Sequence, residues 1–208
     1  MTLLDPTRSA EPAVSEVSTD GVTRRSYSTA WWGMIVLITT EAMVFAILIA
    51  AYLFLRASSK QWPPTGTELP EVPLTLAFSL VLWGSSLPIF WAEAAIQKGN
   101  QARLRAGLLI SFVMGLSFLA YTAKDFLDLH YGWRDSAYGS IFYVIVGLHG
   151  IHVVIGLAMN LVVQIKAWQA KFTAHRHTTV EVFSLYWHFV DVVWLFVMPT
   201  VFLSPHVH

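Results

Sequence analysis

Residues 186–194 of the chain are Tyr186-Trp187-His188-Phe189-Val190-Asp191-Val192-Val193-Trp194. This stretch lies within a longer segment, about 180–203, that is otherwise apolar enough to cross a lipid bilayer. His188 and Asp191 are three residues apart and therefore share one face of a helix. At bilayer depth each ionised group costs about 3 kcal/mol. Because membrane insertion does not require such residues, we expect a neighbour that satisfies them, within this chain or in a partner subunit.

The composition of the chain is that of an integral membrane protein. Of its 208 residues 55% are hydrophobic and 12% are charged, an apolar excess that lies outside the range of ordinary soluble proteins. The formal net charge is zero, which gives no electrostatic reason for a nucleic acid partner. The chain has no cysteine, which excludes disulfides, thiolate metal sites and thiol catalysis.

Five segments reach the length of about 20 residues that is needed to cross the hydrocarbon layer. The sequence therefore predicts an all-α fold, an integral membrane bundle of five transmembrane helices, with the helices at about 30–55, 74–96, 104–123, 139–165 and 180–203. The second segment contains Pro88, which predicts a kink. Residues 1–29 are polar and are predicted to form a disordered tail. Residues 30–203 form the membrane domain, and 204–208 a short external end.

The basic residues predict how the chain is oriented. Nine of the 13 lie in the N-terminal tail and in the links after the second and fourth predicted helices: Arg8, Arg24, Arg25, Lys98, Arg103, Arg105, Lys166, Lys171 and Arg176. The other four lie at the opposite side: Arg56, Lys60, Lys124 and Arg134. Because cytoplasmic loops are enriched in Lys and Arg, the N-terminus is predicted to be cytoplasmic and the C-terminus outside.

Polar residues share one face on two of the predicted helices, because successive residues are rotated by about 100°. These sets are Glu181, Ser184, His188 and Asp191 on the last helix, and His149, His152, Gly156 and Asn160 on the fourth. The first helix carries Glu41 near its centre. Small residues let helices approach, and imidazole and amide groups can bond across the contact. The polar groups of the three helices are therefore expected to face one another, whereas Glu93 is expected near the cytoplasmic interface.

Four interpretations of these polar residues remain open. In the first, His149, His152, His188 and Asp191 are packing residues that fix helix register. In the second, His149 and His152, at i and i+3, bind a metal ion, which would make the chain a membrane metalloenzyme. The third is a proton or ion pathway built on Glu41 and Asp191. The fourth is an interface with lipid head groups or with a partner subunit.

Several motifs resemble subunit III of the haem–copper respiratory oxidases. The stretch 186–194 is similar to the last-helix signature of that family, and residues 147–153 followed by Gly156 resemble its penultimate-helix signature. The remaining matches are Tyr138-Gly139-Ser140, Thr40-Glu41 with Phe45 and Tyr52, and His177 with Glu181. The segment with Glu41 is similar to the helix that bears the buried, carbodiimide-reactive glutamate of the family. The resemblance covers about residues 30–203.

The resemblance implies a role without redox chemistry. Members of the family carry neither haem nor copper, which belong to subunits I and II; they pack on subunit I, hold phospholipid, and support proton uptake and the lifetime of the active site. The chain is therefore expected to be an accessory subunit of a hetero-oligomeric, proton-pumping terminal oxidase in the bacterial plasma membrane. No catalytic, cofactor or metal residue is expected. The residues expected to organise the bundle interior and its lipid or subunit contacts are Glu41, His149, His152, His177, Glu181, His188 and Asp191.

The chain also departs from the family pattern. Many members have seven helices, whereas this chain begins at the equivalent of the third, as the five-helix bacterial members do. At the end of the third predicted helix, Thr122 and Asp125 stand where the family often has Gln and Glu. An accessory subunit of a nitric oxide reductase system, in which members of the family also occur, is the alternative within the same class.

Overall fold

The structure is a computed structural model that describes residues 28–65, 67, 71–129, 131–173 and 176–206. Its α-helices are α1 (Thr29–Ser58), α2 (Val72–Gly84), α3 (Ser86–Gln97), α4 (Gln101–Asp128), α5 (Ala137–Trp168) and α6 (Thr178–Met198). A π-helical turn (Pro199–Leu203) and a 3₁₀ turn (Ser204–His206) extend α6. The described part of the chain has five helical spans long and apolar enough to cross a membrane and no strand, which confirms the predicted fold class. The predicted tail falls outside the described residues except for Ser28 and Thr29.

The second predicted span is divided into two helices. α2 ends at Gly84, α3 begins at Ser86, and together they form the span Val72–Gln97. Pro88 has no backbone N–H and therefore cannot donate to the carbonyl of Gly84, four residues earlier. The kink predicted at Pro88 is thus a break one turn before the proline.

Local capping signals set the ends of several helices. The side chains of Ser28, Asn100 and Ser136 each accept a hydrogen bond from the backbone N–H three residues later, at the starts of α1, α4 and α5. Gly99 lies between α3 and α4 with a φ of 73°, a conformation that costs glycine little. Its N–H donates to the carbonyl of Ile96 at 2.8 Å, so the chain can reverse direction there.

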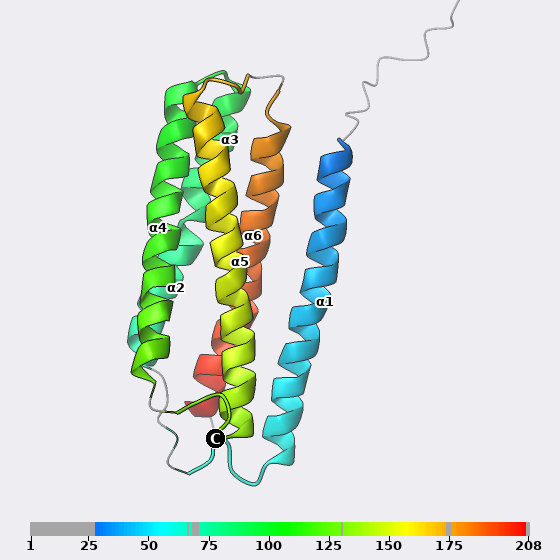
Figure 1. The fold of residues 1–208 in the computed structure, drawn as a ribbon, viewed down its shortest axis with the longest axis vertical. Coiled ribbons are helices and arrows are strands. Elements are labelled where there is room, and N and C mark those ends of the chain that lie inside the picture. The colour runs from blue at the N-terminus through cyan, green and yellow to red at the C-terminus, as the bar shows by residue number, and fades with distance from the viewer. Residues whose placement is uncertain (1–27, 66, 68–70, 130, 174–175, 207–208) are drawn as a thin grey trace, which may run out of the picture.

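The helices form one bundle in which α6 is central and α1 is peripheral (Figure 1). α6 packs against α1, α2, α3 and α5, and more than half of its residues are buried. Among the residues of α1 only Phe45 and Tyr52 are buried. The N-terminal ends of α1, α4 and α6 and the C-terminal ends of α3 and α5 lie at one end of the bundle, at the top of Figure 1. We call this the upper end.

The lower end of α1 is attached to the bundle by an aromatic cluster. Trp62, in the link after α1, donates from Nε1 to the Tyr52 hydroxyl at 3.2 Å. That hydroxyl also lies 3.1 Å from the Ser204 hydroxyl near the C-terminus. Trp62 contacts Tyr138 of α5 edge to face, with ring centroids 5.4 Å apart. The loop, the start of α5 and the end of the chain therefore converge on one helix end.

Trp187 fills the centre of the bundle between two glycines. Its indole is fully buried, and Nε1 donates to Ser85 Oγ at 2.8 Å, at the break between α2 and α3. A Cβ added to Gly115 of α4 would lie 2.6 Å from this ring, and one added to Gly156 of α5 would lie 2.9 Å from it. The indole thus occupies the space that two missing side chains leave between α4 and α5.

Candidate functional site

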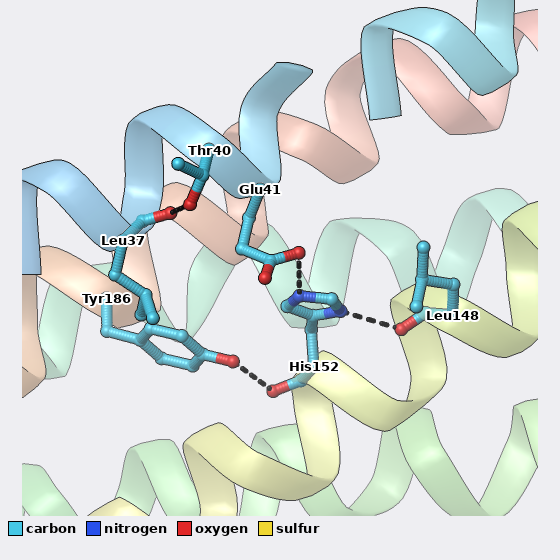
Figure 2. Close-up of polar contacts among 6 residues, drawn as sticks. All are labelled: Leu37, Thr40, Glu41, Leu148, His152 and Tyr186. Carbon is cyan, nitrogen blue, oxygen red and sulfur yellow. Dashed lines mark hydrogen bonds and ion pairs between the residues drawn. The ribbon is translucent and has the colours of Figure 1, made fainter. Parts of the chain in front are cut away.

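Glu41 and His152 connect α1 to α5 (Figure 2). The Oε2 atom of Glu41 lies 3.3 Å from Nε2 of His152. The Nδ1 atom of the same imidazole lies 2.8 Å from the carbonyl oxygen of Leu148. The Tyr186 hydroxyl of α6 donates to the carbonyl of His152 at 3.3 Å. Side chains of α1 and α6 therefore meet one residue of α5.

The hydrogen bonds of His152 determine how many protons this pair holds. A carbonyl can only accept, so Nδ1 carries a hydrogen, and Nε2 of a neutral ring is then an acceptor. An ionised Glu41 is also an acceptor, and two acceptors make no hydrogen bond. The contact becomes a hydrogen bond when one further proton resides on Nε2 of His152 or on the carboxylate of Glu41. The pair can therefore hold a proton between α1 and α5.

His149 lies one turn from His152 in an aromatic environment. The ring is buried and stacks on Trp194 with centroids 4.5 Å apart. Phe45 and Phe118 each make a T-shaped contact with it. Within the part of the chain that the structure describes, neither ring nitrogen has a hydrogen-bond partner, and no group of three or more His, Asp or Glu residues could hold a metal ion.

His188 and Asp191 face α3. The Ser86 hydroxyl lies 2.8 Å from Nδ1 of His188 and donates to Oδ2 of Asp191. Ser184 Oγ lies 3.2 Å from Nε2 of His188 and donates to Oε2 of Glu93 at 2.8 Å. The ring of His188 stacks on Phe90 with centroids 4.1 Å apart.

The expected convergence of polar groups therefore occurs in two places. Glu41 and His152 pair across α1 and α5, whereas His188 and Asp191 bond to Ser86 and, through Ser184, to Glu93. Ser86 was not predicted from the sequence as a member of either site, and Glu93 was expected at the interface and not in this cluster. The signal that could have found them is their spacing, because seven residues place both on one face of α3.

The remaining predicted residues, His177 and Glu181, lie at the start of α6. Nε2 of His177 is 3.1 Å from Oε1 of Glu181, one turn later. His177 is the N-cap residue but makes no side-chain capping bond. A carboxylate in the first turn of a helix interacts favourably with the helix dipole, so this pair stabilises the upper end of α6.

A basic pocket lies beside this end of α6. Lys166, Lys171 and Arg176 line a cavity of about 370 Å³ together with Thr178 and Thr179. An apolar cavity of about 340 Å³ lies between α5 and α6, and Thr179 lines it as well. The side chains that line the apolar cavity are Ile155, Ala158, Met159, Val162, Val163, Thr179, Val182 and Phe183. The charged pocket and the apolar groove therefore adjoin at Thr179.

A second apolar groove lies between α1 and α6. Its volume is about 450 Å³, and Ala42, Ala46 and Ala50 form its α1 side. Phe189, Val192 and Phe196 form much of its α6 side. The small side chains of α1 leave this space open, which agrees with the low burial of α1.

Comparison with known proteins identifies the family of this chain. The family model described as "Cytochrome c oxidase subunit III" matches residues 13–204. The chain belongs to this family. A cytochrome c oxidase subunit 3 from Thermostichus vulcanus is 36% identical over 175 residues, which cover 82% of this chain and 85% of the relative. The protein of the same name from Synechocystis is 35% identical over 176 residues, covering 83% and 74%. The human one is 36% identical over 177 residues, covering 82% and 68%.

Membership in the subunit III family establishes the general role of the chain. It is a multi-pass membrane protein and an accessory subunit of a terminal oxidase, within a multi-subunit complex. Subunit III proteins carry no redox centre. The nitric oxide reductase and metalloenzyme alternatives are not favoured, since the curated relatives reported above are named as cytochrome c oxidase subunits.

Proposed function

We propose that this chain packs on subunit I of a proton-pumping oxidase that also contains subunit II and reduces oxygen to water. The haem and copper would reside in those partners. The observation that carries the proposal is the exposure of α1 at bilayer depth. The Glu41 side chain is 33% exposed near the middle of this helix, and Thr39 and Thr40 are exposed beside it. Because polar groups are costly in lipid, this stretch of α1 is better matched to a partner subunit.

The proposed orientation puts the upper end in the cytoplasm of a bacterium, whose plasma membrane would hold the complex. The link between α3 and α4 and the link between α5 and α6 both lie at the upper end (Figure 1). These links and the helix ends beside them contain six of the basic residues that favour a cytoplasmic location: Lys98, Arg103, Arg105, Lys166, Lys171 and Arg176.

The role in the complex is tested by purifying it through a tag on this chain. The unaltered chain is expected to bring down a haem–copper subunit with oxygen-reducing activity. Glu41→Ala removes one member of the α1–α5 pair, and we expect it to leave the haem spectrum intact while weakening assembly or shortening the period of activity during turnover. Glu71→Ala is the matched control because Glu71 is an exposed glutamate at the lower end of the bundle, just before α2.

Two results would contradict this role. One is a chain that purifies without a haem protein. The other is an immediate loss of haem or copper signals in the Glu41→Ala complex, because that would place this residue at a redox centre. Equal turnover lifetimes in the Glu41→Ala and Glu71→Ala complexes would show that the proposed role does not depend on Glu41. The family assignment would not be affected.

The proposed lipid is an anionic phospholipid whose phosphate occupies the basic pocket and whose acyl chain follows the groove between α5 and α6. Lys166, Lys171 and Arg176 supply the charge, and the Thr178 and Thr179 hydroxyls lie at the N-terminus of α6, where backbone N–H groups favour anions. The apolar groove begins at Thr179. One molecule would thus contact both cavities.

Neutralising the pocket is expected to remove this lipid from the purified complex. In the triple variant Lys166→Gln, Lys171→Gln, Arg176→Gln, the lipid is expected to lose about 1 kcal/mol of binding free energy per basic residue. The three together correspond to an affinity about a hundredfold weaker. Quantitative lipid mass spectrometry measures the anionic phospholipid retained per complex. Lys98→Gln, at the same end but outside the pocket, is the control. Equal retention in the triple variant and the control would exclude this site.

A further inference from the structure

Five side chains of α3 and α6 form a continuous chain of hydrogen bonds. It begins at Glu93, passes through Ser184 to Nε2 of His188, and continues from Nδ1 through Ser86 to Asp191. Ser184 lies 2.8 Å from Glu93 and 3.2 Å from His188, and Ser86 lies 2.8 Å from His188. From Ser184 to Asp191 the chain descends seven residues of α6, which is about 10 Å along the helix axis. Carboxyl, hydroxyl and imidazole groups alternate along it without a gap.

The two ends of this chain lie in different environments. Glu93, Ser184 and His188 line a cavity of about 250 Å³ at the upper end of the bundle, together with Glu181, Trp31, Phe90 and Leu185. Asp191 is only 7% exposed, and its Oδ1 atom has no hydrogen-bond partner among the described residues. The hydrogen-bond chain therefore leads from an open cavity to a buried carboxyl group.

For all four hydrogen bonds to form, the hydrogen-bond chain needs one proton more than a neutral imidazole and two carboxylates carry. A serine hydroxyl has one hydrogen to donate. When Glu93 and Asp191 are both ionised, Ser184 and Ser86 each donate to a carboxylate, so His188 must donate from both ring nitrogens and is then an imidazolium. A neutral His188 satisfies all four bonds only when one of the two carboxyl groups is protonated.

The satisfied states differ only in where the additional proton resides. With the proton on Asp191, every bond points toward Glu93: the acid donates to Ser86, Ser86 to Nδ1, Nε2 to Ser184, and Ser184 to Glu93. With the proton on Glu93, every bond points the opposite way and the imidazole has the other tautomer. Each hydroxyl and the ring accept one proton and release another, so no atom other than hydrogen moves.

We propose that Glu93, Ser184, His188, Ser86 and Asp191 form a proton relay that connects the upper-end cavity with a proton-binding site at Asp191. The bound species is a single proton, which enters from water in the cavity. It is stored at Asp191, because an ionised carboxylate is better solvated at Glu93 beside the open cavity. Glu181 of α6 also faces this cavity and contacts His177. Glu41 of α1 contacts His152 of α5 and forms the separate pair described above.

Infrared spectroscopy of the purified oxidase complex tests the relay. In a transfer from H₂O to D₂O, the unaltered complex is expected to show a protonated carboxyl band that shifts and that Asp191→Asn removes. Ser86→Ala and Ser184→Ala interrupt the relay on either side of His188. Each is expected to keep the band but to slow its exchange about tenfold or more, since each 1.4 kcal/mol added to the barrier slows a step tenfold.

The control and a second variant separate proton transfer from structural effects. Ser140→Ala removes a hydroxyl that bonds to backbone carbonyls outside the relay and is expected to leave exchange unchanged. His188→Gln keeps a side chain that can bond both serines but cannot change tautomer, so it is expected to slow exchange even if a serine variant assembles poorly. A spectrum that Asp191→Asn does not change, or exchange as fast in His188→Gln as in the unaltered complex, would overturn the relay. The readout is proton exchange, so its failure leaves the proposed oxidase role unaffected.

Discussion

Trp187→Ala is expected to lower the free energy of unfolding of the chain by about 3–5 kcal/mol, the usual cost of deleting a buried large aromatic side chain. The indole lies against Gly115 of α4 and Gly156 of α5, and its N–H bonds to Ser85. Neither glycine has a side chain that could move into the space that the substitution leaves. Reversible unfolding of the purified chain in lipid–detergent bicelles measures the loss.

Two further substitutions identify the cause of that loss. Trp187→Phe keeps most of the ring but leaves the Ser85 hydroxyl without its donor, and a loss of about 1–3 kcal/mol is expected. Trp91→Ala is the matched control, because Trp91 is 45% exposed on the outside of α3. If Trp187→Ala cost no more than Trp91→Ala, the two-glycine slot would not be a main source of bundle stability.

The spans and the buried polar residues of this protein could be predicted from its sequence because they depend on local composition. Five apolar segments predicted the five membrane spans, and Gly156 was expected at a close contact. His188 and Asp191 were expected to need a neighbour because a charged group is costly at bilayer depth. Each of these inferences requires only the residues of one helix.

The pairing of polar groups could not be predicted, because it depends on how the helices rotate against one another. Ser86 and Asp191 are 105 positions apart in the chain, and nothing in either segment specifies the other. α6 is packed on several sides, so one of its faces can meet α3 while Tyr186 reaches α5. One polar centre was therefore expected where two exist.

The two polar clusters have a common chemistry but different surroundings. The Glu41–His152 pair lies where α1 meets α5, beside the exposed Thr39 and Thr40 of the stretch proposed to contact a partner. The cluster of His188 and Asp191 lies between α3 and α6 and opens to the cavity at the upper end. Substitutions in the first are therefore expected to affect assembly, and substitutions in the second are expected to affect proton exchange.

Gly107→Leu is expected to separate α3 from α4 and to destabilise the bundle. A Cβ at this position would lie 2.5 Å from the backbone oxygen of Pro88 and 2.8 Å from Cβ of Ala92. A backbone oxygen cannot rotate away as a side chain can, so the helices must move apart, and the cost is expected at the upper end of the about 1–3 kcal/mol that overpacking causes.

Gly150→Ala also adds a side chain to a helical glycine, but it is expected to stabilise the bundle, in contrast to Gly107→Leu. Nothing lies within 4 Å of a Cβ added to Gly150 of α5, and alanine favours a helix over glycine by about 1 kcal/mol. Unfolding in bicelles should therefore show a gain in stability for Gly150→Ala and a loss for Gly107→Leu. If Gly107→Leu were as stable as the unaltered chain, α3 and α4 could not be packed as closely as the structure has them. Because Gly107 faces Pro88 and Ala92, which lie between Ser86 and Glu93 on α3, its substitution should also move these two relay members relative to α6.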